Sequence, residues 1–120
     1  METYLSPSPE QFAKLQELDP KGPIIMLNLL RFKTDGGRER YTEYGSQAAP
    51  FLADAKAQIN YLGDVVTTVI GGEEWDEIIL VEYPSLQAFF EMVGNPDYPG
   101  DVRSDALEDS RLVCTQPRNA

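Results

Sequence analysis

The sequence predicts an α+β domain in which an antiparallel sheet carries helices on one of its faces. Two short segments, Ile24 to Leu30 and Ile78 to Val81, are apolar at almost every position rather than at every second one. Strands with this pattern are buried on both faces. In a chain of 120 residues, one set of helices covers only one face of a sheet. We therefore expect the other face to pack against a second copy of the protein.

The first half of the chain contains signals for two helices and one strand. Ser8 can cap a helix, Gln11 can hydrogen-bond back to the cap, and the Pro- and Gly-containing segment 19–23 ends that helix. A strand then covers Ile24 to about Phe32. Apolar residues recur at steps of three and four in a second helix: Tyr41, Tyr44, Ala48, Phe51, Leu52 and Ala55. Pro50 should break or kink this helix.

The second half of the chain predicts two further strands, two helices and a last strand. Residues 59–70 are rich in β-branched side chains and alternate in polarity, which favours a strand. A glycine turn leads to another strand at Trp75 to Tyr83. Ser85 can cap the helix that follows. A short helix at Asp101 to Asp109 and a strand at Arg111 to Gln116 complete the chain.

The order of these elements is an extra helix followed by β-α-β-β-α-β, which is the arrangement of ferredoxin-like folds. Three parts follow from it. Residues 1–23 form an N-terminal helical extension, residues 24–116 form the ferredoxin-like domain, and residues 117–120 form a polar tail. Face-to-face pairing of two such sheets is the simplest way to cover the open face, so we expect a homodimer.

Composition excludes several classes of partner. Twenty acidic and ten basic residues give a formal net charge of −10. This charge repels nucleic acid and anionic membrane surfaces, and no apolar run approaches the roughly 20 residues that span a bilayer. The single cysteine, Cys114, cannot form an internal disulfide, and no signal peptide is evident. We expect a cytoplasmic protein without nucleic-acid or membrane partners.

The chain contains no histidine. Haem held by a proximal histidine, the usual zinc sites, and catalytic triads or dyads built on histidine each lose an obligatory member. The acidic residues lack the spacing of a calcium loop and are typical of a solvated surface. We therefore expect neither a cofactor nor a metal site.

Several short strings together resemble a known family. They are Met26 to Lys33 (MLNLLRFK), Tyr41 to Tyr44 (YTEY), Trp75–Asp76, Val81 to Ser85 (VEYPS), and Asn95 to Tyr98 (NPDY) before Arg103. Their order, over about residues 24–116, resembles the domain of unknown function 1330 family of the dimeric α/β-barrel superfamily. The resemblance implies a homodimer of ferredoxin-like subunits and kinship with monooxygenases, lactone isomerases and haem-degrading enzymes, but no settled activity. Relatives are expected to read His-Arg where this chain reads Val102-Arg103, so a histidine acid/base role is not carried over.

Two polar residues interrupt or end apolar strands. Asn28 must find hydrogen-bond partners if it is buried. It could orient a ligand carbonyl, or it could pair with a neighbouring backbone or across a dimer interface. Glu82 ends the second apolar segment, where partial burial would suit its carboxylate to general-base chemistry. It could equally be a surface carboxylate or a partner for Arg31.

Cationic and aromatic residues supply the remaining candidates for a site. Arg31 and Arg103 could hold an anionic molecule through a bidentate fork, although arginines in so acidic a chain often pair with Asp or Glu. Tyr41 and Tyr44 lie one helical turn apart and could present hydroxyls to a pocket, or simply form the buried stripe of their helix. The pair Trp75–Asp76 suits a pocket rim or a hairpin anchor.

These candidates define two hypotheses for the function. In the first, the protein binds a small organic acid or phenol between its sheet and helices and carries out cofactor-independent proton transfer or oxygenation. Glu82 or Asp76 would be the base, Asn28 and a tyrosine would stabilise an oxyanion, and Arg103 would hold the anion. In the second, the protein is a non-catalytic module that binds a metabolite or only dimerises.

Overall fold

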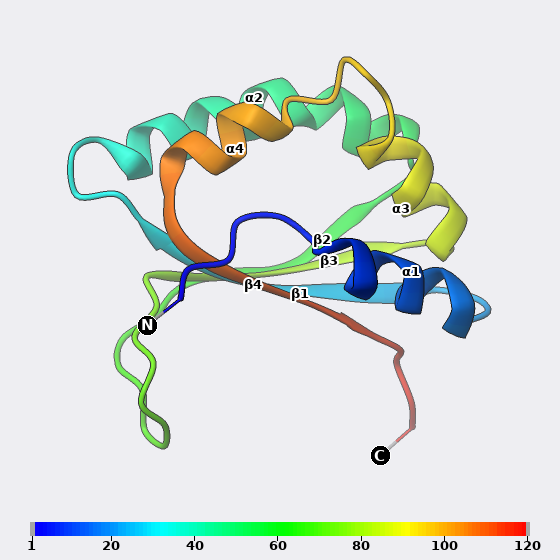
Figure 1. The fold of residues 1–120 in the computed structure, drawn as a ribbon, viewed down its shortest axis with the longest axis horizontal. Helices are drawn as coiled ribbons and strands as arrows, with labels where there is room; N and C mark the ends of the chain where they lie inside the picture. The colour runs from blue at the N-terminus through cyan, green and yellow to red at the C-terminus, as the bar shows by residue number, and fades with distance from the viewer. Residues whose placement is uncertain (1, 120) are drawn as a thin grey trace.

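A computed structural model describes residues 2–119, and Met1 and Ala120 lie outside it. Its elements, in chain order, are α1 (Pro9–Leu18), β1 (Ile24–Phe32), α2 (Gly37–Asp54), β2 (Gln58–Asp64), β3 (Glu77–Tyr83), α3 (Leu86–Val93), α4 (Gly100–Ala106) and β4 (Leu107–Thr115). The four strands form one antiparallel sheet in the order β2-β3-β1-β4. Helices α2, α3 and α4 lie on one side of this sheet (Figure 1). The predicted α+β class and the ferredoxin-like order βαββαβ are confirmed.

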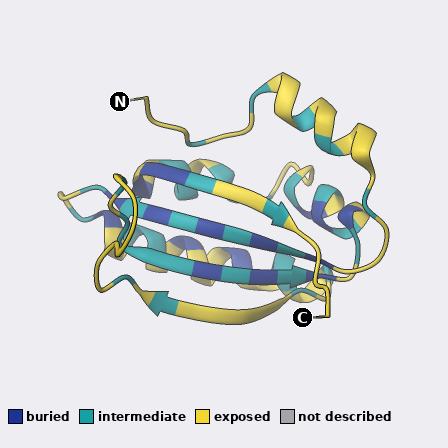
Figure 2. Ribbon diagram, turned by 90° about the horizontal axis from the view of Figure 1, so that it is seen from below, coloured by how far each residue is buried: buried dark blue, intermediate teal, exposed yellow. Residues whose placement is uncertain are grey.

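The central strand β1 fixes the register of the sheet. It pairs with β3 on one side and β4 on the other, and Asn28 lies between Ile79 and Leu112. Side chains alternate along β1 between buried and half-buried classes, so one face of the strand points toward the helices. Figure 2 shows the other face, on which the alternate residues of β1 and β3 are only half-buried in the single chain. We call this second face the open face.

The core lies between the sheet and the helices. Its buried apolar members are Ile24, Met26, Leu30, Phe32, Ile79, Val81, Tyr83, Leu86, Phe89, Met92 and Leu107. Ile24, Leu30 and Leu107 are fully buried. The core therefore uses the even-numbered positions of β1 and the odd-numbered positions of β3, and this alternation decides which polar side chains reach the helix layer.

Two predicted helix caps are confirmed, and of the predicted break or kink at Pro50, the break is wrong. The hydroxyl of Ser8 accepts from the amide of Gln11 at 3.1 Å. The hydroxyl of Ser85 accepts from the amide of Ala88 at 3.1 Å. Helix α2, in contrast, continues through Pro50 to Asp54. Pro50 is exposed, so the carbonyl that loses its donor faces solvent and can bind water.

Two strand boundaries differ from those that the sequence predicts. The predicted strand 59–70 ends at Asp64, and residues 65–76 form a loop, because no strand of the same chain lies beside residues 65–70. The last strand begins at Leu107 rather than at Arg111. Asp109 belongs to this strand because it pairs in register with Arg31 of β1, and its carboxylate accepts from the amide of Tyr4 at 2.8 Å.

The N-terminal segment is attached to the last strand and to α3. Besides the contact with Asp109, the hydroxyl of Ser110 donates to the carbonyl of Tyr4. Phe12 of α1 packs on Phe90 of α3, with 4.9 Å between ring centroids. Figure 1 shows this segment passing over β4 before it reaches α1. Within residues 2–119, no helix has the length and apolar character that crossing a membrane requires.

Candidate functional site

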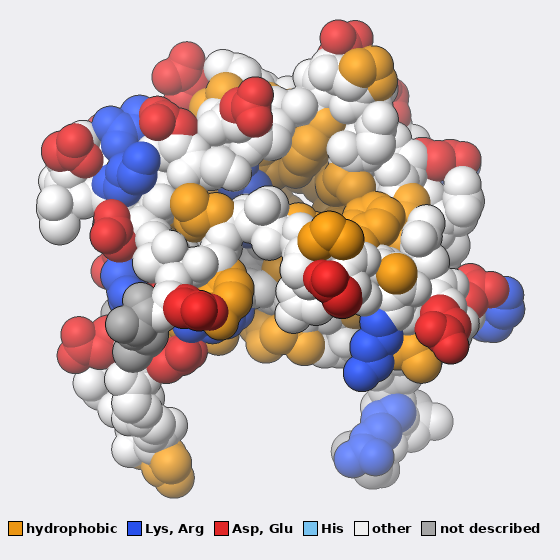
Figure 3. All heavy atoms as spheres, viewed as in Figure 1, with side chains coloured by type: hydrophobic (Ala, Val, Ile, Leu, Met, Phe, Trp, Pro, Cys, Tyr) orange, Lys and Arg blue, Asp and Glu red, His pale blue; other side chains and the backbone are white. Residues whose placement is uncertain are grey.

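A group of polar and aromatic side chains meets between the sheet and the helix layer. We call it the tyrosine–arginine site, and its members are Asn28 from β1, Tyr41 and Tyr44 from α2, Tyr83 from β3, Tyr98 from the segment before α4, and Arg103 from α4. Figure 3 shows that the surface is hollowed between the helix layer and the sheet, with hydrophobic and basic side chains at the floor of the hollow. The site therefore combines aromatic walls with a positive charge.

Asn28 connects the sheet to Arg103. Its side chain is 8% exposed, and its amide nitrogen donates at 3.4 Å to the carbonyls of Met26 and of Ile79. Its oxygen accepts from Nη2 of Arg103 at 3.3 Å. Because a guanidinium only donates, this contact fixes which amide atom faces α4. The amide nitrogen is thus directed at the sheet, and the residue holds Arg103 rather than offering a donor to a ligand.

Arg103 differs from most other arginines of residues 2–119 in its charge environment. Other arginines, such as Arg31, Arg38, Arg40 and Arg111, each form an ion pair with a carboxylate. No carboxylate oxygen within residues 2–119 forms such a contact, at 4.0 Å or less, with the half-buried Arg103. In a chain with a formal net charge of −10, this is an unneutralised cation among neutral groups. Such a group favours an anionic ligand.

The tyrosines surround this charge with neutral hydroxyl groups. Burial raises the pKa of Tyr41 to about 12, although the nearby guanidinium of Arg103 opposes the shift. Burial likewise raises the pKa values of Tyr44, Tyr83 and Tyr98. The hydroxyls of Tyr44 and Tyr98 share a hydrogen bond. All four phenols keep their protons at neutral pH, and the protons that the Tyr44–Tyr98 bond does not use can be donated to an anion.

Glu77 is a carboxylate that lies on the same side of the sheet as this site. It pairs in register with the buried Leu30, so its side chain points toward the helix layer. Burial raises the pKa of its carboxyl, while Arg38, with Nη1 3.8 Å from Oε1, partly opposes the shift. The sequence reasoning missed Glu77, Tyr83 and Tyr98. The alternation of β3 is the signal that could have found the first two, since Glu77, Ile79, Val81 and Tyr83 share one face.

The predicted convergence of Glu82 with Asn28 and Arg103 is wrong. Glu82 pairs in register with Ile25 on the open face, and its carboxylate accepts from the amide of Asn60 at 3.0 Å. It therefore lies on the side of the sheet opposite to Asn28. Of the two alternatives for Glu82, the pairing with Arg31 does not occur, because Arg31 lies near the end of β1 opposite to Ile25 and contacts residues around Trp75.

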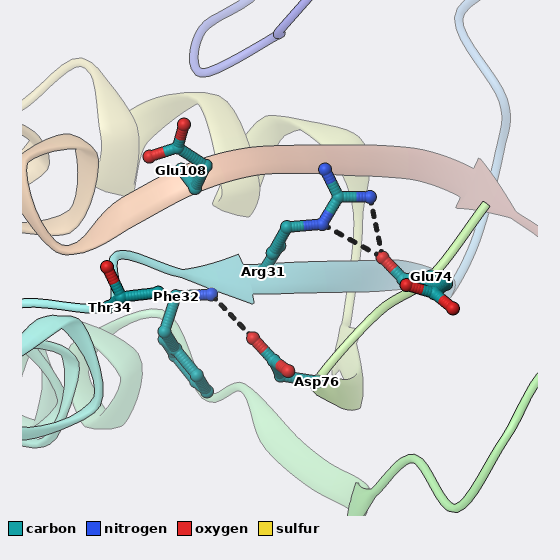
Figure 4. A pocket seen from close by; sticks show the side chains of 6 residues that line it. All are labelled: Arg31, Phe32, Thr34, Glu74, Asp76 and Glu108. Carbon is teal, nitrogen blue, oxygen red and sulfur yellow. Dashed lines mark hydrogen bonds between the residues drawn. The ribbon is translucent and has the colours of Figure 1, made fainter.

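Three other predicted site residues form a second group at the end of β1. Nε and Nη2 of Arg31 donate to the carbonyl of Glu74 at 3.0 and 2.7 Å. The carboxylate of Asp76 accepts from the amide of Phe32 at 2.8 Å, as Figure 4 shows. The ring of Trp75 lies under Arg31, whose guanidinium carbon is 5.2 Å from the ring centroid. These contacts anchor the start of β3 to the end of β1. Of the two roles considered for Trp75–Asp76, they correspond to the hairpin anchor.

A pocket of about 410 Å³ opens beside this second group. Its lining residues are Arg31, Phe32, Thr34, Glu74, Asp76 and Glu108 (Figure 4). Three carboxylates line the pocket, and its one guanidinium already donates to a backbone carbonyl, so the pocket suits an organic anion poorly. Within residues 2–119, no set of three or more His, Cys, Asp or Glu side chains is arranged to hold a metal ion. The tyrosine–arginine site is the better candidate for binding chemistry.

Comparison with known proteins agrees with the fold. The chain matches no family model and no curated protein. Among solved structures, it is similar to the methylated RPA0582 protein, with 35% sequence identity over 99% of this chain and 98% of that chain and a TM-score of 0.90. A second RPA0582 structure, described as a protein of unknown function from Rhodopseudomonas palustris, has 32% identity, coverage of 99% and 100%, and a TM-score of 0.88.

A more distant likeness adds only the fold. SnoaB, described as a cofactor-independent oxygenase from Streptomyces nogalater, has 13% identity over 83% of this chain and 97% of that chain, with a TM-score of 0.57. The similarity to RPA0582 supports family membership as well as the fold, because it exceeds 30% identity over nearly the whole length of both chains. The chain therefore belongs to the same family as the RPA0582 protein of Rhodopseudomonas palustris, a protein of unknown function.

Proposed function

We propose that the protein is a homodimer that binds a small organic acid or phenol, as its anion, in the tyrosine–arginine site. The observation that carries this proposal is the half-buried guanidinium of Arg103, which has no carboxylate partner within residues 2–119. A buried or half-buried charge without a counter-charge is costly. A carboxylate or phenolate ligand would neutralise this charge and accept from the guanidinium fork.

The surrounding groups favour a planar ligand. The rings of Tyr41 and Tyr44 lie 5.2 Å apart, and the rings of Tyr44 and Tyr98 meet edge to face at 6.2 Å. Aromatic walls of this kind accommodate another flat ring, and neutral hydroxyls donate to its oxygen atoms. Asn28 takes the role of a positioning residue, because it holds Arg103 from the floor of the site.

The same arrangement supports cofactor-independent chemistry on a bound acid or phenol. Removal of a proton from the ligand by Glu77 would leave an enolate or phenolate, and Arg103 and the tyrosine hydroxyls would stabilise that charge. Burial raises the pKa of Glu77, which makes its carboxylate a stronger base than an exposed one. An anion of this kind is the species that isomerisation or reaction with dioxygen requires. The activity printed for SnoaB belongs to this class of reaction, although that likeness extends to the fold alone.

Three finer assignments belong to the same proposal. The half-buried aliphatic residues of the open face support the homodimer. The family strings quoted above support membership of the domain of unknown function 1330 family, and Tyr41, Tyr44, Tyr98 and Arg103 from those strings meet at the site. A cytoplasmic location accords with the single cysteine of the chain.

The test is a calorimetric titration of the purified protein with benzoate, salicylate and phenol. We expect at least one of these ligands to bind, and the Arg103→Gln variant to bind it ~10²-fold more weakly, as the loss of a charge-assisted pair implies. Arg118→Gln, in the exposed tail, removes the same charge and should bind normally. Absence of binding by all three, or equal loss in both variants, would overturn the proposal.

Catalysis is tested separately from binding. Phenol or salicylate is incubated with the protein in D2O, and NMR follows the ring hydrogens ortho and para to the phenolic oxygen, which exchange through the keto tautomer of the phenolate. Exchange that requires the wild-type protein and falls ~10²-fold or more in Glu77→Gln supports proton transfer at this site. Binding without exchange or turnover would favour the alternative, a non-catalytic metabolite-binding module.

A further inference from the structure

A second pocket lies between the end of α2 and helix α3, outside the tyrosine–arginine site. Its volume is about 300 Å³, which is enough for a small organic molecule. Figure 1 shows α3 at the same end of the molecule as the last turn of α2. Phe51 lies between this pocket and the tyrosine–arginine site, because it lines the pocket while its ring meets that of Tyr98 edge to face, with 5.7 Å between centroids. We call this cavity the α2–α3 pocket.

One part of the wall of the α2–α3 pocket is apolar. It consists of Phe51 from α2, Pro84 from the segment before α3, and Ala88 and Met92 from α3. Ala88 and Met92 lie one turn apart, so they form one continuous strip along the helix. Met92 is buried, and its flexible side chain can adapt to the shape of a bound group. A small apolar group is therefore more favourable against this wall than in water.

The α2–α3 pocket also carries both signs of charge. Asp54 and Lys56 come from the end of α2, and Glu91 comes from α3. Within residues 2–119, no contact of 4.0 Å or less joins any of these three side chains to an opposite charge. Asp54 is the last residue of α2, where the negative end of the helix dipole adds to the attraction for a cation. One cationic and two anionic groups are thus free to contact a ligand.

The backbone of Lys56 is unusual for a lysine. Its φ is 58°, in the left-handed region, and Asp19 is the only other non-glycine residue of the described chain with a positive φ. The amide of Ala57 donates to the carbonyl of Leu52 at 2.9 Å, and the amide of Lys56 donates to that of Ala53 at 3.1 Å. This pair of bonds ends a helix and favours glycine at the position of Lys56, where a Cβ is strained. A function of the lysine side chain would account for its presence there.

We propose that the α2–α3 pocket binds an α-amino acid with an apolar side chain. The carboxylate of the ligand accepts from the ammonium of Lys56, and the ammonium of the ligand donates to Asp54 or Glu91. The apolar side chain packs on the wall that Met92 contributes. A zwitterion fits this pocket better than a simple anion or cation, because it gives partners to both signs of charge. The inference goes beyond the proposed function and concerns a different cavity.

The test is an NMR titration of isotope-labelled protein with leucine, isocaproate and isoamylamine. Isocaproate lacks the ammonium of leucine, isoamylamine lacks its carboxylate, and both keep its apolar group. We expect saturable binding of leucine that shifts the amides of Lys56, Ala88 and Met92, and at least ~10-fold weaker binding of the other two probes. Failure of leucine to bind, or shifts confined to other segments, would overturn the assignment of the pocket. Equal binding of either singly charged probe would overturn the preference for a zwitterion.

Variants of Lys56 separate ligand binding from stability. Lys56→Gln removes the ammonium and should weaken leucine binding at least ~10-fold. Lys14→Gln, at an exposed position of α1, is the matched control and should bind leucine normally. Lys56→Gly should lose as much affinity, yet raise the melting temperature by about 2–5 °C, because glycine relieves the left-handed backbone.

The two Lys56 variants also define the results that would contradict the proposal. Leucine binding of wild-type strength in Lys56→Gly or Lys56→Gln would remove Lys56 from the site. An equal loss of affinity in Lys14→Gln would show a general effect of net charge rather than a contact with the ligand. Leucine binding and ligand binding at Arg103 are measured in separate titrations, so failure of one leaves the other standing.

Discussion

Replacing Arg111 with Gln should destabilise the fold far more than the same change at Arg103. Nη1 of Arg111 donates to Oδ1 of Asp109 at 2.8 Å, and Nη2 donates to Glu73 at 3.0 Å. The guanidinium also lies over the ring of Trp75, with 5.0 Å to the centroid. Asp109 is 1% exposed, so the substitution would leave a buried carboxylate whose remaining cation, Arg31, lies 3.9 Å away.

The structure sets the expected magnitude. Removing one partner of a buried ion pair costs about 3–5 kcal/mol when the remaining charge is uncompensated. Here the amides of Tyr4 and Ser110 still donate to the carboxylate, and the Arg111 side chain is itself 22% exposed. We therefore expect Arg111→Gln to lower the free energy of unfolding by about 2–4 kcal/mol. Arg103 donates to a neutral amide oxygen, and its loss should cost about 1 kcal/mol or less.

Urea unfolding at one fixed protein concentration measures both variants, because dimerisation makes the apparent stability depend on concentration. Ligand titration on the same proteins gives the complementary result. Arg103→Gln should lose ligand binding and keep its stability, while folded Arg111→Gln should bind normally. Equal losses of stability in the two variants would refute the assignment of one arginine to the fold and the other to the site.

Further predictions concern a titrating group, a hydroxyl and two glycines. Burial alone would raise the pKa of Asp109, but hydrogen bonds from Tyr4, Arg111 and Ser110 outweigh it and hold the pKa below its usual 3.8. The charged carboxylate of Asp109 therefore stabilises the fold above pH 3.8, and this stabilisation is lost as the pH falls through the lower pKa of the folded state. We expect the melting temperature of Asp109→Asn to fall less steeply than that of the wild type as the solution is acidified. Tyr44→Phe removes one hydroxyl of a shared hydrogen bond and should cost about 1 kcal/mol in urea unfolding. Gly37→Ala would place a methyl group 2.5 Å from a backbone carbonyl and should destabilise by about 1–3 kcal/mol, whereas Gly45→Ala meets no atom within 4 Å and should stabilise by about 0.5–1 kcal/mol in the same assay.

Local signals in the sequence predicted the elements whose partners lie within this chain. The apolar segment from Ile24 to Phe32 became the central strand with the predicted bounds, because its neighbours β3 and β4 cover both edges. Ser8 and Ser85 cap their helices because capping needs only residues within one turn. Residues 65–70 did not form the predicted strand, because no neighbouring strand of the chain lies beside them to accept their backbone hydrogen bonds.

The site was harder to predict because it depends on which face each strand residue occupies. Asn28 and Glu82 both interrupt apolar segments, yet the register pairs Asn28 with Ile79 and places Glu82 on the opposite face. A shift of one residue would exchange the two faces, and the sequence contains no direct record of the register. The contact between Arg103 and Asn28 spans 75 positions of the chain and depends on where α4 lies over the sheet.

The central position of β1 has a consequence for the order in which the chain becomes able to fold. One edge of β1 pairs with β4, which comprises residues 107–115, near the end of the chain. The amide of Tyr4 also has its hydrogen-bond acceptor, Asp109, in this strand, 105 positions later in the chain. A ribosome-bound chain that lacks β4 therefore carries an apolar strand with one edge unpaired, and such an edge recruits other chains. Synthesis of residues 107–115 is the event that allows the sheet to close, so chains stalled or truncated before β4 should be the aggregating species.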